Sequence, residues 1–337
     1  MDVSAVFELP VHIWVMSNAL GMTYPTGFGD LRFSVVMPED RQPLGGPPLG
    51  LGIESRPELA GEHVVWTQEY GAHIPESRQP ATALHRIGIT HVDGPTYDHR
   101  AWFTPDHQLA EFINGWFNEV RTWAEIMTGQ DLDPNHPVYD ANPVGAGLTF
   151  VEPPHDDALG VTIAMSSVLP LTAHEWSTIL RLVRDGGEPP LEEVLSRDAR
   201  AAHRRNATRR AILDAATALE IALGRLVRDQ AGRLPDRQRE RISERTALGG
   251  YISIAEQSDL ELAVPVDRLR WLNDLRNDAA HRGEAPTHWD AGNAVQVMID
   301  FLGAHGRARR RGEREPDGSE WVMVEPESDD AHDVQKS

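Results

Sequence analysis

Short runs of β-branched and aromatic residues, separated by proline- and glycine-rich stretches, make up the first hundred positions of the chain. Residues of these types fit the pleated surface of a sheet, so the runs predict β-strands. The predicted strands are Val3–Val15, Leu31–Met37, His63–Gln68 and Thr82–Val92. The stretches Gly21–Asp30 and Gln42–Gly52 lie between them and are typical of turns and loops.

An amphipathic helix is expected after these strands. The triplet Thr104-Pro105-Asp106 has the composition of a helix start. The apolar residues that follow recur at intervals of three and four, which places them on one helical face: Leu109, Phe112, Ile113, Trp116, Phe117, Val120 and Trp123. We expect both Trp116 and Trp123 in the core or at an interface, and the helix should end near Gly129.

Residues 1–187 are therefore expected to form an α+β domain. Leu148–Val151 and Leu159–Ser166 return to a strand-like composition. Thr172 is placed to cap a second helix that runs through Val183. No motif in this part indicates a ligand, so its specificity is left open.

Every segment after the linker Asp185–Pro190 has a helical pattern. The expected helices are Leu191–His203, Ala207–Asp229, Arg239–Gln257 with a break at Gly249 and Gly250, a helix capped by Asp267 and stopped by Gly283, and Trp289–Leu302. Short connections between them predict an all-α, up-and-down bundle over residues 188–303. Charged and small residues dominate afterwards, so residues 304–337 are expected to form a disordered acidic tail.

Composition and charge narrow the functional classes. The chain has no cysteine, and we find neither a secretion signal nor an apolar run of ~18 residues, so we expect a cytoplasmic protein without membrane contact. The formal net charge of −20 disfavours a nucleic-acid partner. However, residues 1–189 carry roughly −16, residues 190–314 roughly +3 and residues 315–337 roughly −7. The arginines are concentrated in the helical part, which permits RNA binding there.

One segment of the predicted bundle has the residue types of a catalytic site. Arg276 and Asn277 are followed, after three further residues, by His281 late in a predicted helix. On these residues the chain from about 188 to 303 resembles the HEPN superfamily of helical bundles. Many members of that superfamily are metal-independent ribonucleases whose motif is an Arg, a polar residue, three residues and a His. The resemblance does not extend to the first 187 residues.

The resemblance implies a metal-independent endoribonuclease that uses no cofactor and acts as a homodimer through its C-terminal bundle. It further implies a role in toxin or anti-phage defence, with the N-terminal domain sensing a ligand or regulating the bundle. The chemistry suits the residue types. RNA carries its own nucleophile, the 2′-hydroxyl, so the protein supplies a proton carrier such as His281 and a cation such as Arg276.

The remaining geometry also favours a dimer. Asn277 would hold the phosphate or the histidine. Five residues at 100° each place Arg276 and His281 about 140° apart on their helix, so the two converge only near the helix end. A second copy across a two-fold axis would complete the site.

Structural roles stay open for the same residues. Arg276 could pair with Glu220 of a neighbouring helix at the edge of the core, and Glu220 would otherwise border the site. His281 would interact favourably with the helix dipole whatever its role. The arginine cluster forms either a solvated face or an RNA-backbone contact, and it comprises Arg204, Arg205, Arg209 and Arg210. A second functional class remains, a non-enzymatic HEPN-like module that dimerises and binds a nucleotide or a partner.

Other patterns are weaker. Arg197, Asp198 and His203 give a looser version of the motif with one additional residue, on the opening helix where the family does not place it. The segments His91–Asp93 and His155–Asp157 could hold a metal ion, but neither has a partner at ligand spacing. We therefore predict no metal site.

Overall fold

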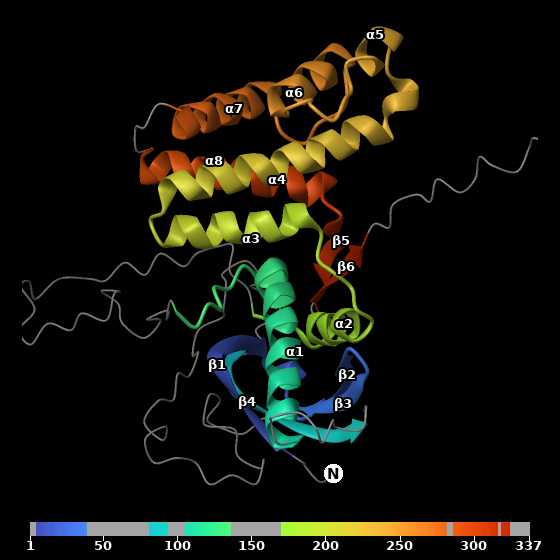
Figure 1. The fold of residues 1–337 in the computed structure, drawn as a ribbon, viewed down its shortest axis with the longest axis vertical. Helices are drawn as coiled ribbons and strands as arrows, with labels where there is room; N and C mark the ends of the chain where they lie inside the picture. The colour runs from blue at the N-terminus through green and yellow to red at the C-terminus, as the bar shows by residue number, and fades with distance from the viewer. Residues whose placement is uncertain are drawn as a thin grey trace, which may run out of the picture. The chain divides into compact units, whose positions relative to one another are not determined.

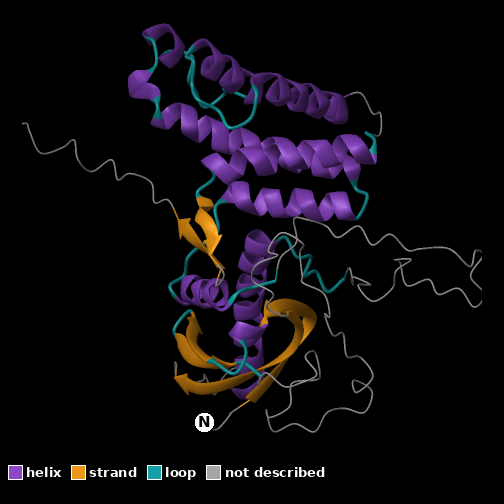
Figure 2. Cartoon of the chain, turned by 180° about the vertical axis from the view of Figure 1, so that it is seen from behind, coloured by secondary structure: helices purple, strands orange, loops and turns teal. Residues whose placement is uncertain are grey.

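The structure is a computed structural model that describes residues 5–38, 81–93, 105–135, 170–281, 286–315 and 318–323 (Figure 1). The chain divides into two compact units, residues 1–188 with 313–320 and residues 189–312 with 321–337. The first unit holds an antiparallel sheet and two helices, and the second holds the remaining helices (Figure 2). The predicted fold class, an α+β domain followed by an all-helical bundle, is confirmed.

A four-stranded antiparallel sheet with the strand order β1-β4-β3-β2 forms the base of the first unit. Its strands are β1 (Ala5–Met16), β2 (Thr23–Phe28), β3 (Leu31–Val36) and β4 (Ala81–Asp93). β4 pairs with both β1 and β3, in the registers Trp14↔Ala83 and Val35↔Ile89. Three of the predicted strands are thus confirmed, and the fourth, His63–Gln68, lies outside the described residues.

Strand β2 lies in Gly21–Asp30, which the sequence predicts to be a turn, and that prediction is wrong. β2 is an edge strand, and an edge tolerates Pro25 because one row of its N–H groups faces no partner strand. A Cβ on Gly27 would lie 2.5 Å from the carbonyl oxygen of Leu31, so no larger residue fits there. Gly29, with a φ of +54°, makes the tight turn into β3. The proline and glycines of this segment are therefore part of a β-hairpin at the edge of the sheet and do not form a loop.

Two helices pack with this sheet, α1 (Pro105–Thr128) and α2 (Ala173–Arg184), close to the predicted bounds. Thr172 caps α2 as predicted, and it does so in a capping box with Glu175. Leu148–Val151 and Leu159–Ser166, predicted as strands, lie outside the described residues.

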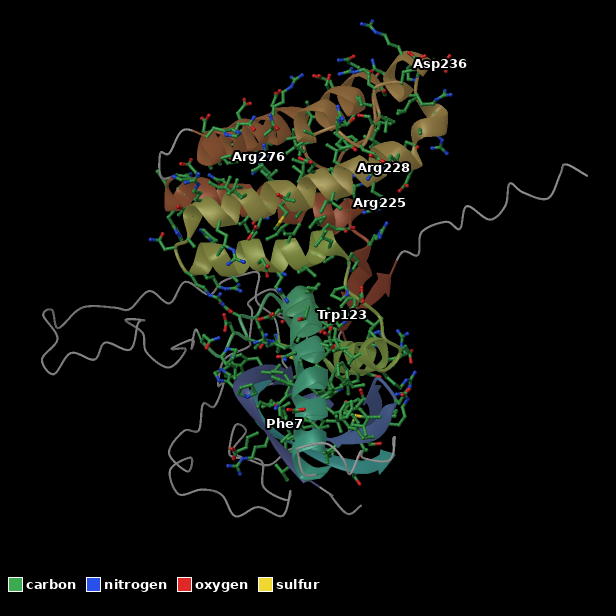
Figure 3. The ribbon with its side chains drawn as sticks, viewed as in Figure 1. Phe7, Trp123, Arg225, Arg228, Asp236 and Arg276 are labelled. Atoms are coloured by element: carbon green, nitrogen blue, oxygen red, sulfur yellow. The ribbon has the colours of Figure 1, made fainter. Side chains whose placement is uncertain are left out.

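Aromatic side chains of α1 form the core of the first unit. Trp116 and Trp123 are fully buried, as predicted from their spacing. The indole Nε1 of Trp116 donates to Thr26 Oγ1 at 3.1 Å, and that hydroxyl donates to the Leu180 carbonyl at 3.0 Å. Phe7 of β1 packs against α1 with its ring centroid 5.3 Å from that of Phe117 (Figure 3). One chain of contacts therefore joins α1, β2 and α2.

The second unit is a bundle built around the alanine-rich helix α4 (Thr208–Asp229), which packs against four other helices. These are α3 (Leu191–Arg204), α6 (Leu248–Gln257), α7 (Val266–His281) and α8 (His288–His305). The apolar stripe of α4 is buried at Ile212, Ala216, Leu219 and Leu223. The predicted position of the linker is also confirmed, because α3 starts directly after Pro190. Asp267, expected as a cap, instead lies in the first turn of α7.

The helix predicted over Arg239–Gln257 is interrupted, but not at the glycine pair. A single turn, α5 (Asp236–Arg239), is followed by a loop, and α6 contains both Gly249 and Gly250. The physical reason lies in the loop: Thr246 Oγ1 accepts the Ser243 N–H at 2.9 Å and donates to the Arg241 carbonyl at 3.0 Å. Such side-chain bonds compete with the helical ladder and end it there.

The segment after α8 differs from the sequence expectation. α8 continues to His305, and Ala308–Glu315 (β5) pairs with Gly318–Met323 (β6) in a two-stranded sheet. Residues 324–337 of the predicted disordered tail lie outside the described residues. In the part of the chain that is described, no helix is both long and apolar enough to span a membrane.

Candidate functional site

The motif residues Arg276, Asn277 and His281 all lie in the last turn and a half of α7. Leu269, Leu272 and Ala279 hold this helix in the core. Arg276 lies one turn from both Leu272 and Ala279, at the edge of that apolar face, whereas His281 lies away from it. Arg276 and Asn277 are half-buried, and His281 is exposed at the helix end. Figure 3 labels Arg276 on α7. Its guanidinium donates to the Asn277 side-chain oxygen at 3.1 Å.

Arg276 and His281 do not meet within one copy of the chain. Among the described residues, no hydrogen bond joins them, and no carboxylate lies within ion-pair distance of Arg276. A guanidinium has five N–H donors, so several remain for an anion. The predicted divergence of the two side chains along the helix therefore corresponds to the geometry of α7.

Glu220 makes a backbone contact that neither interpretation of the sequence anticipated. Its Oε2 accepts the backbone N–H of Leu248 at 3.1 Å, at the start of α6. The N-cap residue there is Ala247, which has no side chain to cap the helix, so the carboxylate of α4 takes over that task. A negative charge at a helix N-terminus is also favoured by the helix dipole. This contact is structural, and no described ion pair joins Glu220 to Arg276.

The four clustered arginines fall into different environments. Arg209 and Arg210, in the first turn of α4, are exposed, whereas Arg204 and Arg205 at the end of α3 are half-buried. Arg209 donates to the carbonyl oxygen of Ala280 at 3.1 Å and so connects the start of α4 to the last turn of α7. Because the last carbonyls of a helix lack intrahelical partners, this contact holds the turn that carries His281.

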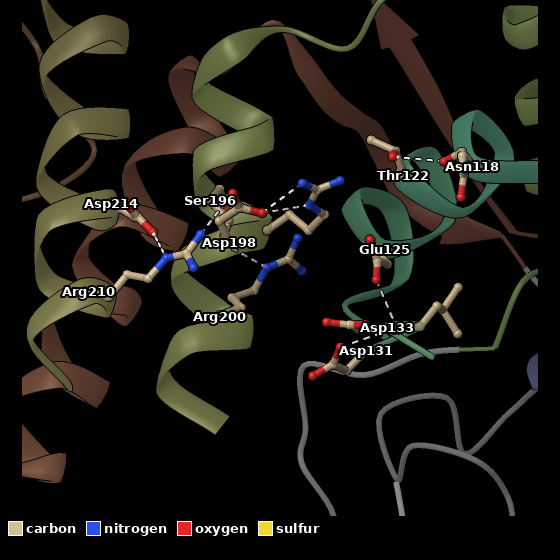
Figure 4. A network of polar contacts seen from close by, with 12 residues as sticks. Asn118, Thr122, Glu125, Asp131, Asp133, Ser196, Asp198, Arg200, Arg210 and Asp214 are labelled. Carbon is tan, nitrogen blue, oxygen red and sulfur yellow. Dashed lines mark hydrogen bonds and ion pairs between the residues drawn. The ribbon is translucent and has the colours of Figure 1, made fainter. Parts of the chain in front are cut away.

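Arg210 is instead engaged with carboxylates. Its Nε donates to Asp214 at 3.2 Å, and one of its terminal nitrogens lies 3.7 Å from Asp198 of α3 (Figure 4). Burial raises the pKa of the Asp214 carboxyl, and the bond from Arg210 opposes that shift. Arg210 also lines an open hollow of about 470 Å³ at the start of α4, together with Asn206, Ala207, Thr208, Arg209, Leu213 and Asp214.

A pair of stacked imidazoles lies where α3 ends and α8 begins. The rings of His203 and His288 have centroids 4.1 Å apart and planes inclined by 21°. Nε2 of His203 lies 3.3 Å from the carbonyl oxygen of His288. Burial lowers the pKa of His203, and the nearby His288 and Arg204 lower it further. These contacts give the looser motif a packing role, since its Arg197 also pairs with the adjacent Asp198 at 2.7 Å.

Four helix ends therefore meet at one end of the bundle: the ends of α3 and α7 and the starts of α4 and α8. The contacts Arg209–Ala280 and His203–His288 join them in pairs. Sequence reasoning missed His288 and the exposed Trp289, because their significance depends on which helix ends become neighbours. The resulting surface combines imidazoles, guanidinium groups and an aromatic side chain, which are the groups that bind a nucleic-acid strand.

Comparison of the chain with protein-family models, with curated proteins and with solved structures gives no match. The resemblance to HEPN bundles therefore rests on the motif and the helical pattern. Within the described residues no three His, Asp or Glu side chains gather as metal ligands. The side chains of His91–Asp93 and His155–Asp157, weighed above as metal ligands, lie outside the described residues.

Proposed function

We propose that the protein is a metal-independent endoribonuclease of the HEPN type, with Arg276, Asn277 and His281 as its reacting groups. One observation carries the proposal most strongly. His281 is exposed at the end of α7, and Arg276 on the same helix is half-buried and bonded to an amide rather than to a carboxylate. A proton carrier and an available cation therefore occupy one helix end, beside the arginines of α3 and α4.

The proposed reaction needs no nucleophile from the protein. The 2′-hydroxyl of the RNA attacks the adjacent phosphorus, a new P–O2′ bond forms, and the P–O5′ bond breaks. The proton lost by the 2′-oxygen and the proton gained by the 5′-oxygen pass through histidine, whose ordinary pKa lies near neutrality. Arg276 stabilises the charge that develops on the phosphoryl oxygens. The products are a 2′,3′-cyclic phosphate and a 5′-hydroxyl.

A second copy of the chain completes the site in this proposal. One histidine cannot act as base and acid on opposite sides of the phosphorus at the same moment. Two-fold symmetry pairs the same patch of each copy and brings two histidines and two arginines to one phosphate. The first unit would then regulate the bundle or sense a ligand. Activation of the bundle would arrest growth of the host cell.

The test uses the full-length protein and a labelled RNA in excess chelator. We expect cleavage that leaves cyclic-phosphate and 5′-hydroxyl ends, with the DNA of the same sequence intact because it lacks the 2′-hydroxyl. Chelator-sensitive cleavage, or equal cutting of DNA, contradicts the mechanism. RNA binding without cleavage favours the non-enzymatic module instead.

The dimer is tested by adding an excess of the His281→Ala variant to the unaltered protein. A mixed dimer holds one histidine at the shared site, where the reaction needs two, so we expect the added variant to lower the cleavage rate. If each copy held a complete site, the added variant would leave the rate unchanged. Light scattering at tens of micromolar gives the independent measure, and a monomer there removes the composite site.

A further inference from the structure

Trp289 displays its indole to solvent at the start of α8. It is 77% exposed, more than either of the other two exposed large hydrophobic residues of the described chain, Met22 at 48% and Leu191 at 59%. The following residues Ala291 and Ala294 face the core and are fully buried. One face of α8 is therefore buried in the core, and Trp289 lies outside that face.

The turn that carries Trp289 is held firmly. Thr287 and Asp290 form a reciprocal capping box, with the Asp290 N–H donating to Thr287 Oγ1 at 3.1 Å and the Thr287 N–H donating to Asp290 at 3.2 Å. His288 stacks on His203, as described above. A Cβ on Gly292 would lie 3.1 Å from Nε2 of His203, so glycine lets α8 approach α3 this closely. The indole is thus presented by a fixed backbone.

The same end of the bundle carries cations suited to a polyanion. His203 continues into Arg204 and Arg205, and the chain then enters α4 at Arg209. Arg209 donates to a carbonyl oxygen, and among the described residues it forms no ion pair with a carboxylate. The exposed Arg209 and the half-buried Arg204 and Arg205, at the same end of the bundle as a rigid aromatic ring, match the two parts of a nucleotide, its phosphate and its base. This charge complementarity favours a nucleic acid as the ligand of the surface at Trp289.

We propose that Trp289 stacks on an unpaired base of the RNA, so that the substrate is single-stranded. This inference rests on the proposed function, since the same strand would place its phosphate at His281, eight positions earlier in the chain. In a duplex the base faces are already stacked on one another and are closed to a side chain. Every base has an aromatic face, so the stacking by itself favours strand state over sequence.

Binding of a fluorescent single-stranded RNA, and of the same RNA annealed to its complement, tests the proposal by anisotropy. The measurements use full-length protein carrying His281→Ala, so that cleavage does not interfere. We expect Trp289→Ala to weaken single-strand binding on the order of 10-fold, Trp289→Phe to retain most of it, and duplex binding to be weak throughout. Leu191→Ala, which removes an exposed hydrophobic side chain at the other end of α3, is the matched control and should change nothing.

The outcomes separate this inference from the proposed function. Normal binding and cleavage by Trp289→Ala, or equal binding of the duplex, overturns the stacking site and leaves the ribonuclease intact. Single-strand binding that depends on Trp289, in a protein that never cleaves, supports the stacking site and overturns the ribonuclease. If Trp289→Ala changes the molecular mass in light scattering but not the RNA affinity, Trp289 belongs to a protein interface and the inference fails.

Discussion

Arg86 of the first unit has different surroundings from Arg209 and Arg276 of the bundle. In the first unit, Arg86 is 2% exposed and lies 3.2 Å from the Glu8 carboxylate. In the bundle, Arg209 and Arg276 donate to a carbonyl oxygen and to an amide oxygen, and neither has a carboxylate partner among the described residues. A cation that folding leaves without a counter-ion can bind an anionic ligand at little desolvation cost. The difference directs the search for function to the end of the bundle.

The two units also differ in where their polar side chains lie. The first unit uses its polar side chains to close its own backbone: Gln130 bonds both the N–H and the carbonyl of Trp14, and Glu125 accepts the N–H of Leu132 (Figure 4). Such contacts stabilise the unit because a buried backbone group without a partner is costly. The centre of the bundle is filled mainly with alanine and leucine, its buried carboxylates Glu192 and Glu193 lie in the first turn of α3, and its described histidines lie at helix ends.

The largest expected effect is on RNA cleavage. His281→Ala should reduce the rate by at least about 100-fold, because it removes the one histidine of α7 and with it the group whose ordinary pKa lies near neutrality. Arg276→Ala should cause a loss of similar order, since it removes the phosphate cation. Single-turnover cleavage and thermal melting are measured together. His174→Ala, an exposed histidine of α2, is the matched control and should cleave normally. If activity falls only in step with melting temperature, Arg276 is a structural residue.

The second effect compares two tryptophans. Trp116→Ala should destabilise the first unit by about 3–5 kcal/mol, because it leaves a cavity and removes the donor bonded to Thr26. Trp289→Ala, at 77% exposure, should change the unfolding free energy by less than about 0.5 kcal/mol. Urea unfolding followed by circular dichroism measures both. A large loss of stability on Trp289→Ala would contradict the view that this indole is free for a ligand.

Much of the fold was predictable because it rests on local periodicity. The spacing of apolar residues gives α1 and α4 almost to the residue, and Thr172 marks the start of α2. Strand β2 was missed because proline and glycine acquire their meaning from the sheet edge and from a close approach to Leu31. The break before α6 was misplaced for a similar reason, since it depends on how Ser243 and Thr246 bond the backbone.

The candidate site was predictable only in part. Arg276, Asn277 and His281 are close in sequence, so one helix suffices to group them. The contact of Arg209 with Ala280 spans 71 positions, and that of His203 with His288 spans 85. Residue types and spacing carry no information about such pairs, because helix packing decides which ends become neighbours. Trp289 acquires significance only once these ends are together.

A smaller effect separates the two exposed arginines of α4. Arg209→Ala frees the Ala280 carbonyl and loosens the last turn of α7, so we expect cleavage to fall several-fold and stability by about 1 kcal/mol or less. Arg210→Ala removes surface contacts with Asp214 and Asp198, which contribute little in solvent, and should leave cleavage within about twofold of the unaltered protein. Equal effects of the two substitutions on cleavage would mean that both arginines act only through overall charge.

The smallest effect concerns pH and the stacked imidazoles. The pKa of His203 in the folded protein is lower than its ordinary value of 6.5, because burial and the neighbouring His288 and Arg204 disfavour its charged form. Above that ordinary value the residue is neutral in both states, and its contribution to stability is fully present. As the pH falls from 6.5 toward the folded-state pKa, the unfolded chain takes up the proton first, so stability declines. Urea midpoints of the full-length protein should therefore drop more between pH 7.5 and 5.5 than those of His203→Asn, which cannot titrate. All other groups titrate alike in both proteins. If the two urea midpoints changed in parallel with pH, protonation of His203 would not destabilise the stacked pair of imidazoles. The end of the bundle would then show no pH dependence of stability that distinguishes it from the first unit.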